Sequence, residues 1–421
     1  MTRLPPIRGT GKDAGASRTM THSTSLRERL LLLAGVLIAG LLLAALVYAA
    51  LTEVGGKNSA ALVADAFLNG RLWVGTCFDL DCAIFNGRTY VVFPPFAGIA
   101  AMPLAAIGGA STFGFIPLTT LCFLLSLLKW IRVFRRLGVR YPAWIWLVLA
   151  VGFSSPLFYV TIRGDGIWFF AQSIGFLMTS LAIHEALAGR LVSAGVAISC
   201  AFLSRQMSIF YVPLLLIFSL RTDAPLWSAM PDKINRTIKL GIPVAAAIGF
   251  YLLYNQARFG SPFDSGYAYI DYPPGILKER LATHGLWSLS YLPFNLYHAL
   301  VQGFHARFEG VGNVDLVGMD RFGTAFLVAS PWLAMLFFTP INRRTVFSGL
   351  LVAGLITVMV FYHSNGYTQY NVQRYMLDWL PAALVMLAYA IERQKSPLFP
   401  LAVLWGMGLN AVTIATMAVV Q

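Results

Sequence analysis

The segment at residues 30–51 (LLLLAGVLIAGLLLAALVYAAL) is an unbroken apolar run long enough to cross a lipid bilayer as a helix. Such a helix needs about 20 apolar residues to cross roughly 30 Å of hydrocarbon. No small-residue cleavage motif follows the run and further apolar segments recur along the chain, so we interpret it as a first span rather than a signal peptide. Charged residues make up 12% of the 421 residues, against about 25% in soluble domains. The sequence therefore predicts an all-α polytopic membrane protein.

The basic residues set the expected orientation of the spans. They cluster at the ends of apolar segments, as in residues 129–140 (KWIRVFRRLGVR), which is typical of cytoplasmic loops rather than of a nucleic-acid-binding surface. We interpret the Pro-containing segment 91–109 as lying in the outer interface, because a crossing there would turn that basic tail outward. About 11 spans result, with the N-terminus inside and the C-terminus outside: residues 30–51, 113–133, 143–160, 166–184, 191–204, 206–220, 238–256, 322–340, 345–362, 376–391 and 397–420.

The predicted organisation is one membrane domain with two long outer loops. Residues 1–29 are expected to be a cytoplasmic tail without stable structure, and residues 30–421 a single transmembrane domain. The loops cover residues 52–112 and 257–321, and most of the 18 acidic residues fall on the outer side. Chemistry on the outer face would explain this distribution, and so would the need of long loops for polar residues.

Two cysteines bracket a pair of acids in the first of these loops. Cys77 and Cys82 are spaced to close a disulfide in an oxidising compartment, and no metal site is expected because no histidine lies nearby in the sequence. Asp79 and Asp81 would face the same side if the segment is extended, and paired carboxylates can provide a general base. The alternative is that one of them caps a turn and the other is solvated.

Several stretches, taken in order, resemble a known family. They are LTEVGGKNSAALVADAFLNGRLWV, NGRTYVVFPPFAGIAAMPLAAIGG and RVFRRLG, followed by RGDGIWFFAQSIGFLMTSLAIHEALAGR, AISCAFLSRQ, RFGSPFDSGY and QYNVQRYMLDWLP, between about residues 50 and 393. They resemble the GT-C membrane glycosyltransferases, and most of all the bacterial branch related to protein O-mannosyltransferases and the lipid A aminoarabinose transferase. The resemblance implies a GT-C fold with interfacial helices in a periplasmic first loop, where Tyr90 follows the Asn-Gly turn as a substrate-binding candidate.

The resemblance also implies an activity. It is inverting transfer of a sugar from a polyprenyl-phosphate donor to a lipid- or glycan-linked acceptor of the cell envelope, such as lipopolysaccharide. The protein would lie in the bacterial inner membrane with its site facing the periplasm. No nucleotide-binding motif is present in the sequence, and no cofactor or metal is expected beyond the lipid-linked donor.

One departure from the family pattern affects the expected base. The family often has an acidic pair soon after the first span, where this chain has Gly55 and Gly56. We therefore rank Asp81 first as general base, Asp79 second and Glu53 third.

Four arginines are candidates to hold the donor phosphate, because a guanidinium offers a planar fork of donors. They are Arg163, Arg205, Arg258 and Arg374. Asp165 is expected to orient Arg163 or assist the acceptor, and Tyr375 adjoins Arg374. For Arg205, an ion pair with Asp165 or a snorkelling anchor is the alternative, and Arg374 could belong to a structural triplet with Tyr375 and Asp378.

Two other classes of function compete with the transferase. A lipid or glycolipid transporter or flippase would place ionisable groups within its spans, but few are expected there beyond Glu185, Arg205 and Asp378. A non-catalytic membrane scaffold would leave the loop carboxylates replaceable, and we rank it last.

Overall fold

The structure, a computed structural model, describes residues 26–220, 230–370, 372–394 and 396–420. Within these residues, six helices are long and apolar enough to cross a membrane, and a seventh span results if one bent pair counts as a single crossing. The chain is therefore a multi-pass membrane protein. The six are α1 (Leu26–Thr52), α4 (Ile116–Arg136), α7 (Ile167–Leu187), α10 (Met230–Phe259), α14 (Arg343–Val360) and α16 (Leu398–Val420); the bent pair is α5 (Ala143–Phe153) with α6 (Pro156–Ile162), at 44°.

Shorter helices and two hairpins complete the fold. The remaining helices are α2 (Ser59–Leu68), α3 (Phe96–Gly108), α8 (Leu191–Phe202), α9 (Val212–Ser219), α11 (Ile276–His284), α12 (Leu292–Leu300), α13 (Phe326–Ala329) and α15 (Met376–Arg393). The 3₁₀ helices are η1 (Gln206–Tyr211), η2 (Tyr267–Tyr269), η3 (Leu289–Tyr291), η4 (Val311–Asn313) and η5 (Pro331–Phe338). Strand β1 (Cys82–Phe85) pairs antiparallel with β2 (Arg88–Val91), and β3 (Ala306–Glu309) pairs with β4 (Asp315–Met319).

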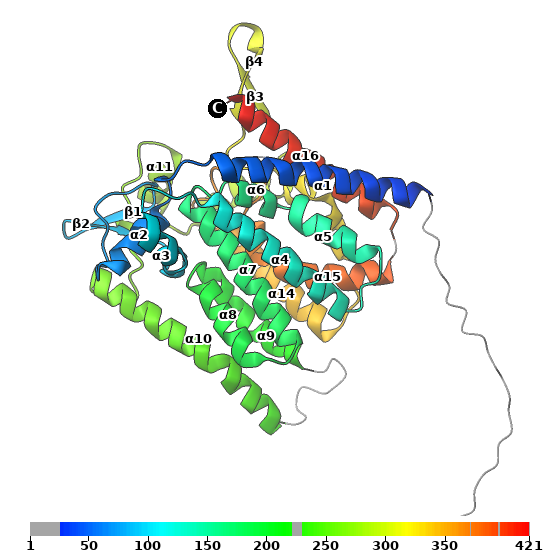
Figure 1. Cartoon of the computed structure of the whole chain (residues 1–421), viewed down its shortest axis with the longest axis horizontal. Coiled ribbons are helices and arrows are strands. Elements are labelled where there is room, and N and C mark those ends of the chain that lie inside the picture. The colour runs from blue at the N-terminus through cyan, green and yellow to red at the C-terminus, as the bar shows by residue number, and fades with distance from the viewer. Residues whose placement is uncertain (1–25, 221–229, 371, 395, 421) are drawn as a thin grey trace, which may run out of the picture.

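The helices surround a core built on α7, which is buried along most of its length and packs against α4, α8 and α15. Helix α1 lies across the outside of this body, and its large apolar side chains such as Leu41 stay exposed, as expected for a lipid-facing helix. Figure 1 shows α2, α3, α11 and the β1–β2 hairpin gathered at one end of the body, and the β3–β4 hairpin projecting beside α16. The first and second loops therefore meet at one end of the helical bundle.

The expected number of 11 spans stays a prediction, and one expected span has a different form. Residues 322–340 contain only α13 and η5, separated at Ser330. Pro331 follows this break and has no N–H to continue an α-helical ladder, which explains the interruption. The expected break after residues 191–204 is present, because α8 ends at Phe202 and η1 begins at Gln206. The expected N-terminal tail lies outside the described residues, except that residues 26–29 belong to α1.

The first outer loop folds as a compact unit. Asn58 caps α2 by accepting a hydrogen bond from the backbone of Ala60, and a Cβ atom at Gly98 in α3 would collide with Val63 in α2, so the two helices cross closely. The Asn86-Gly87 pair forms the β1–β2 turn with φ values of 48° and 72°, as the dipeptide predicts. Helix α3 has 13 residues and is too short to cross about 30 Å of hydrocarbon, which agrees with its interpretation as an interfacial helix.

Candidate functional site

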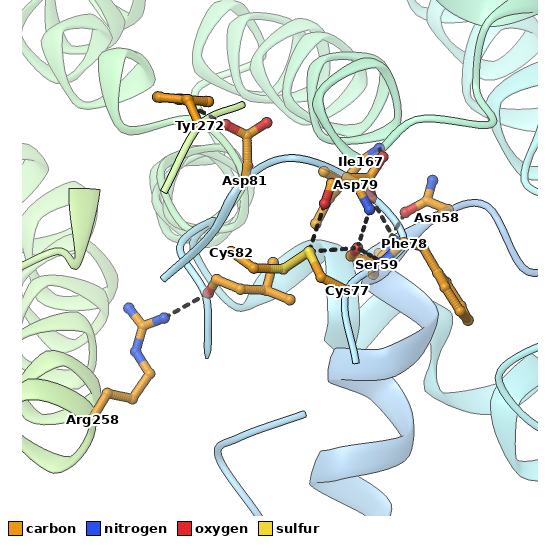
Figure 2. The surroundings of a disulfide bond; sticks show 12 residues. Asn58, Ser59, Cys77, Phe78, Asp79, Asp81, Cys82, Ile167, Arg258 and Tyr272 are labelled. Carbon is orange, nitrogen blue, oxygen red and sulfur yellow. Dashed lines mark hydrogen bonds between the residues drawn. A yellow bond between two sulfur atoms is a disulfide. The ribbon is translucent and has the colours of Figure 1, made fainter. Parts of the chain in front are cut away.

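The expected disulfide is present between Cys77 and Cys82, whose Cα atoms are 6.2 Å apart. It closes a short loop in front of β1, and Figure 2 shows Asp79 and Asp81 leaving this loop in different directions. The two carboxylates do not share a face as an extended segment would require, because residues 78–80 bend before the strand starts at Cys82. The side chains of Asp79 and Asp81 therefore lie in different surroundings.

Asp79 joins the N-terminal ends of two helices. Its carboxylate accepts hydrogen bonds from the backbone N–H of Ser59 in α2 at 2.7 Å and of Ile167 in α7 at 3.4 Å. The Ser59 hydroxyl in turn accepts from the backbone N–H groups of Phe78 and Asp79, each at 3.1 Å. Burial nevertheless raises the pKa of Asp79 to about 7. These contacts fix the loop against the helical body.

Asp81 points toward the second outer loop. Its Oδ1 atom accepts a hydrogen bond from the Tyr272 hydroxyl at 3.1 Å, and its backbone carbonyl accepts one from Val92 N at 3.2 Å. Burial raises the pKa of this carboxyl to about 6, although Tyr272 and Arg374 oppose the shift. A carboxyl whose pKa lies slightly below neutrality is ionised at pH 7 and still a usable base. The geometry thus favours Asp81 over Asp79 as the candidate general base, because the carboxylate oxygens of Asp79 accept hydrogen bonds from two helix N-termini.

A cavity of about 380 Å³ lies between α10, α14 and the start of α15. Tyr267 and Tyr362 form part of its wall. Burial, with the charge of Asp81 contributing, raises the pKa of both phenols. Asp81 is connected to this wall through Tyr272, which donates to it and whose ring centroid is 6.4 Å from that of His363, the residue after Tyr362. A second, apolar groove of about 330 Å³ between η1, α9 and α14 shares Leu355 and Val358 with the cavity. The cavity, which contains a charged pair, therefore adjoins an apolar groove along membrane helices.

Arg205 and Asp378 both line the cavity and form an ion pair across it. The Nε and Nη2 atoms of Arg205 donate to the two carboxylate oxygens of Asp378 at 3.2 and 2.5 Å. The Arg205 guanidinium also stacks near the Tyr375 ring, 5.4 Å from its centroid. The pair fixes the fork of donors, and the remaining N–H groups of Arg205 are free to bind an anion in the cavity. The partner expected from the sequence, Asp165, is not the one observed.

The other three candidate arginines are held by the protein itself, and among the described residues Arg205 alone of the four lines this cavity. Arg163 pairs with Asp165 at 3.3 Å, as expected. Arg374 donates to the carbonyls of Gly366 and Tyr367 and to the Gln172 side chain, and it stacks on Tyr375. These contacts give Arg374 a structural role at the start of α15, beside Asp81.

Arg258 supports the hairpin that follows the loop with the two acids. It is 2% exposed, donates from Nη1 to the Val91 carbonyl at 2.8 Å, and stacks 3.9 Å from the Tyr254 ring centroid. Val91 pairs with Cys82 across the hairpin, so Arg258 ties α10 to the base of the disulfide loop (Figure 2). Tyr90 in the same strand is 5% exposed and packs on the Phe259 ring at 5.3 Å.

Glu53 and the glycines after it also have structural explanations. The Glu53 carboxylate accepts a hydrogen bond from Ile116 N at 2.6 Å and so satisfies the first turn of α4. A Cβ atom at Gly55 would lie 2.5 Å from the Ser111 carbonyl oxygen, so a larger residue does not fit here. The two glycines after Glu53 therefore lie where the backbone passes close to residues 111–113.

Two cavity residues were not recognised from the sequence as site residues. Tyr362 follows α14 in an aromatic-rich run (FYHSNGY), and that run beyond a span was the available signal. Asp378 was considered only as part of a structural triplet. Charged side chains within membrane segments tend to pair with one another, so an ion pair between Asp378 and Arg205 was the better inference.

No known protein-family profile and no curated protein sequence matches the chain. Among solved structures, it is similar to ArnT from Cupriavidus metallidurans bound to undecaprenyl phosphate, with a TM-score of 0.50 and 14% identity over 91% of this chain. It is also similar to ArnT from the same organism in the apo state, with a TM-score of 0.48 and 15% identity over 91% of this chain. In both comparisons the chain covers 63% of the length of the ArnT chain. At this identity the likeness concerns the fold.

Proposed function

We propose that this chain, which has the membrane fold of the GT-C glycosyltransferases, moves a sugar from a polyprenyl-phosphate donor to a hydroxyl of a lipid- or glycan-linked acceptor. The observation that carries the proposal is the cavity, which joins an arginine fork, a nearby carboxylate and an apolar groove. The similar ArnT structure is bound to undecaprenyl phosphate, which supports a donor of that class. The reaction would take place at the outer face of the bacterial inner membrane.

In the proposed mechanism the donor phosphate binds at Arg205 and its isoprenoid chain extends along the apolar groove. Asp81 accepts the proton of the acceptor hydroxyl as that oxygen attacks the anomeric carbon from the side opposite the phosphate. The bond between this carbon and the phosphate oxygen breaks, and the released polyprenyl phosphate gains one negative charge. Arg205 stabilises this charge in surroundings of low polarity, where the interaction is stronger than in water. A single displacement of this kind inverts the anomeric configuration.

The proposal is tested with purified protein in detergent, supplied with undecaprenyl phosphate carrying glucose, aminoarabinose or N-acetylglucosamine and with extracted envelope glycolipids. We expect at least one donor to be converted to undecaprenyl phosphate while a glycolipid gains the mass of one sugar, with inverted configuration by NMR. Transport of the intact lipid across proteoliposomes with no covalent product would contradict the transferase and favour a flippase.

The disulfide should matter for this reaction because it fixes the loop that carries Asp81. Replacing Cys77 and Cys82 with serine is expected to lower transfer about tenfold and the stability of the fold by about 2 kcal/mol, from loop-closure entropy. A reducing agent should lower wild-type transfer to the same extent. The measurement is the initial rate of sugar transfer together with the melting temperature in detergent.

A matched control replaces Cys122 and Cys200, the cysteines that form no disulfide. This variant should respond to the reducing agent as the wild type does. Transfer by the wild type that is insensitive to complete reduction of the Cys77–Cys82 bond would show that the loop is held by its other contacts, such as those of Asp79.

A further inference from the structure

The cavity wall contains a ring pair formed by two segments that are far apart in the sequence. Trp287 and Tyr362 face each other as an isolated antiparallel bridge, with ring centroids 4.9 Å apart. Two backbone hydrogen bonds flank them, from Ser288 N to the Phe361 carbonyl and from His363 N to the Leu286 carbonyl, each at 3.0 Å. The second outer loop is thereby pinned to the end of α14.

Side-chain hydrogen bonds fix the backbone that carries Tyr362. Asn295 is 2% exposed and donates from Nδ2 to the Tyr362 carbonyl at 2.8 Å, and Arg280 donates from Nη1 to the His363 carbonyl at 2.8 Å. The Trp287 side chain is nonetheless 49% exposed although it lines the cavity. An indole held rigidly with an open face is suited to receive a ligand rather than to fill a core.

Ring contacts connect Tyr362 to both the proposed base and the arginine. The centroid of the His363 ring is 4.5 Å from that of Tyr362 and 6.4 Å from that of Tyr272, which donates to Asp81. On the other side, the Tyr362 ring centroid is 6.3 Å from that of Tyr375, against which Arg205 stacks. Phe263, which is 86% exposed, marks the open side of the same cavity. A ligand resting on Trp287 and Tyr362 would therefore have one end near Asp81 and the other near Arg205.

The formal charges of the lining cancel. Arg205 and Asp378 are the charged residues among the described residues that line the cavity, and they are bonded to each other. The remaining polar side chains, including Gln206, Asn255 and Ser265, are neutral hydrogen-bonding groups. These neutral groups can donate to and accept from the hydroxyls of a sugar.

We propose, building on the proposed function, that Trp287 and Tyr362 form the platform for the sugar ring of the donor. The C–H groups on one face of a pyranose ring pack against the negative face of an aromatic ring, and its hydroxyls bind neutral donors and acceptors. The platform holds the anomeric carbon between the Arg205 fork and Asp81.

The test is isothermal titration in detergent, without acceptor, using undecaprenyl phosphate, its glucose conjugate and its aminoarabinose conjugate. Trp287→Ala should weaken binding of the glucose conjugate about tenfold and of undecaprenyl phosphate by less than about twofold. Trp287→Phe should restore most of the affinity for the conjugate, because it keeps an aromatic face. Trp287→Ala should also weaken binding of the aminoarabinose conjugate, because either pyranose ring presents C–H groups to the indole.

The control is Trp405→Leu, which removes an exposed indole of α16 that lies outside the cavity lining and should leave all three affinities as in the wild type. Equal weakening of both glucose conjugate and bare lipid by Trp287→Ala would overturn the proposal. If the protein transfers sugar but Trp287→Ala binds the conjugate as the wild type does, only this inference is wrong. If binding depends on Trp287 but no sugar is transferred, the proposed function is wrong and the sugar platform remains supported. If the folded protein binds none of the lipids, both are wrong.

Discussion

Replacing Asp81 with asparagine is expected to lower the rate of sugar transfer roughly 10²–10⁴-fold, the range typical for loss of a general base. Asparagine has nearly the same shape and can still accept the hydrogen bond from Tyr272, which Asp81 receives at 3.1 Å. It cannot take a proton from the acceptor hydroxyl. The measurement is the initial rate at saturating donor, together with donor affinity, which should change little because Arg205 binds the phosphate.

The same substitution should stabilise the protein at high pH. Burial raises the pKa of Asp81 from its ordinary 3.8 to about 6. The folded state therefore gains stability from protonated Asp81, and this contribution is lost as the pH rises from about 4 through about 6. The difference corresponds to about 3 kcal/mol. The melting temperature of Asp81→Asn in detergent should exceed that of the wild type at pH 8, and the two should converge as the pH approaches 4.

The pH dependence of transfer separates the two loop acids. Only the carboxylate form accepts a proton, so if Asp81 is the base, wild-type transfer should rise with pH with a midpoint near 6. It should level off about one pH unit above that midpoint. Burial raises the pKa of Asp79 to about 7, so a midpoint near 7 would point to Asp79 instead.

The control for the first substitution is Asp79→Asn. It retains an oxygen that can accept from Ser59 N or Ile167 N, and we expect at most about a tenfold loss of transfer, through a looser loop rather than lost proton transfer. Full transfer by Asp81→Asn would remove Asp81 from the mechanism. A larger loss in Asp79→Asn than in Asp81→Asn would exchange their roles.

Features with local causes could be predicted from the sequence. The apolar run of α1, the Asn86-Gly87 turn and the disulfide between Cys77 and Cys82 each depend on a few neighbouring residues. The GT-C fold followed from a series of degenerate motifs whose order is informative although each motif alone is weak. In all these cases the relevant information lies within one short stretch or in the order of stretches.

Features that depend on contacts between distant segments could not be predicted. Arg205 and Asp378 are 173 positions apart, and nothing local to LSRQ distinguishes Arg205 from Arg258, which instead supports the β1–β2 hairpin. The two loop aspartates follow the same rule, because their different directions depend on α2, α7 and Tyr272. The sequence therefore predicted the set of candidate residues better than the role of each.

Removing the Arg205 fork is the second substitution with a large expected effect. A phosphate held by charge-assisted hydrogen bonds from this guanidinium should lose roughly 10–100-fold in affinity when they are absent. Arg205→Ala alone would leave Asp378, whose side chain is 15% exposed, without its partner, and an unpaired buried carboxylate destabilises the fold. The informative variants are Arg205→Lys, which keeps the charge but not the fork, and Arg205→Met combined with Asp378→Leu, which removes the pair together.

Asp378→Asn is expected to change the affinity for undecaprenyl phosphate in the opposite direction. It removes the carboxylate that competes with the phosphate for Arg205, so undecaprenyl phosphate should bind this variant as tightly as the wild type or several-fold more tightly. Arg205→Lys and the double variant should bind it more weakly, and their melting temperatures report whether the fold survives. If the folded double variant binds undecaprenyl phosphate with wild-type affinity, Arg205 has only a structural role and the phosphate binds elsewhere. An anion site cannot lose the one cation that lines it among the described residues without losing affinity.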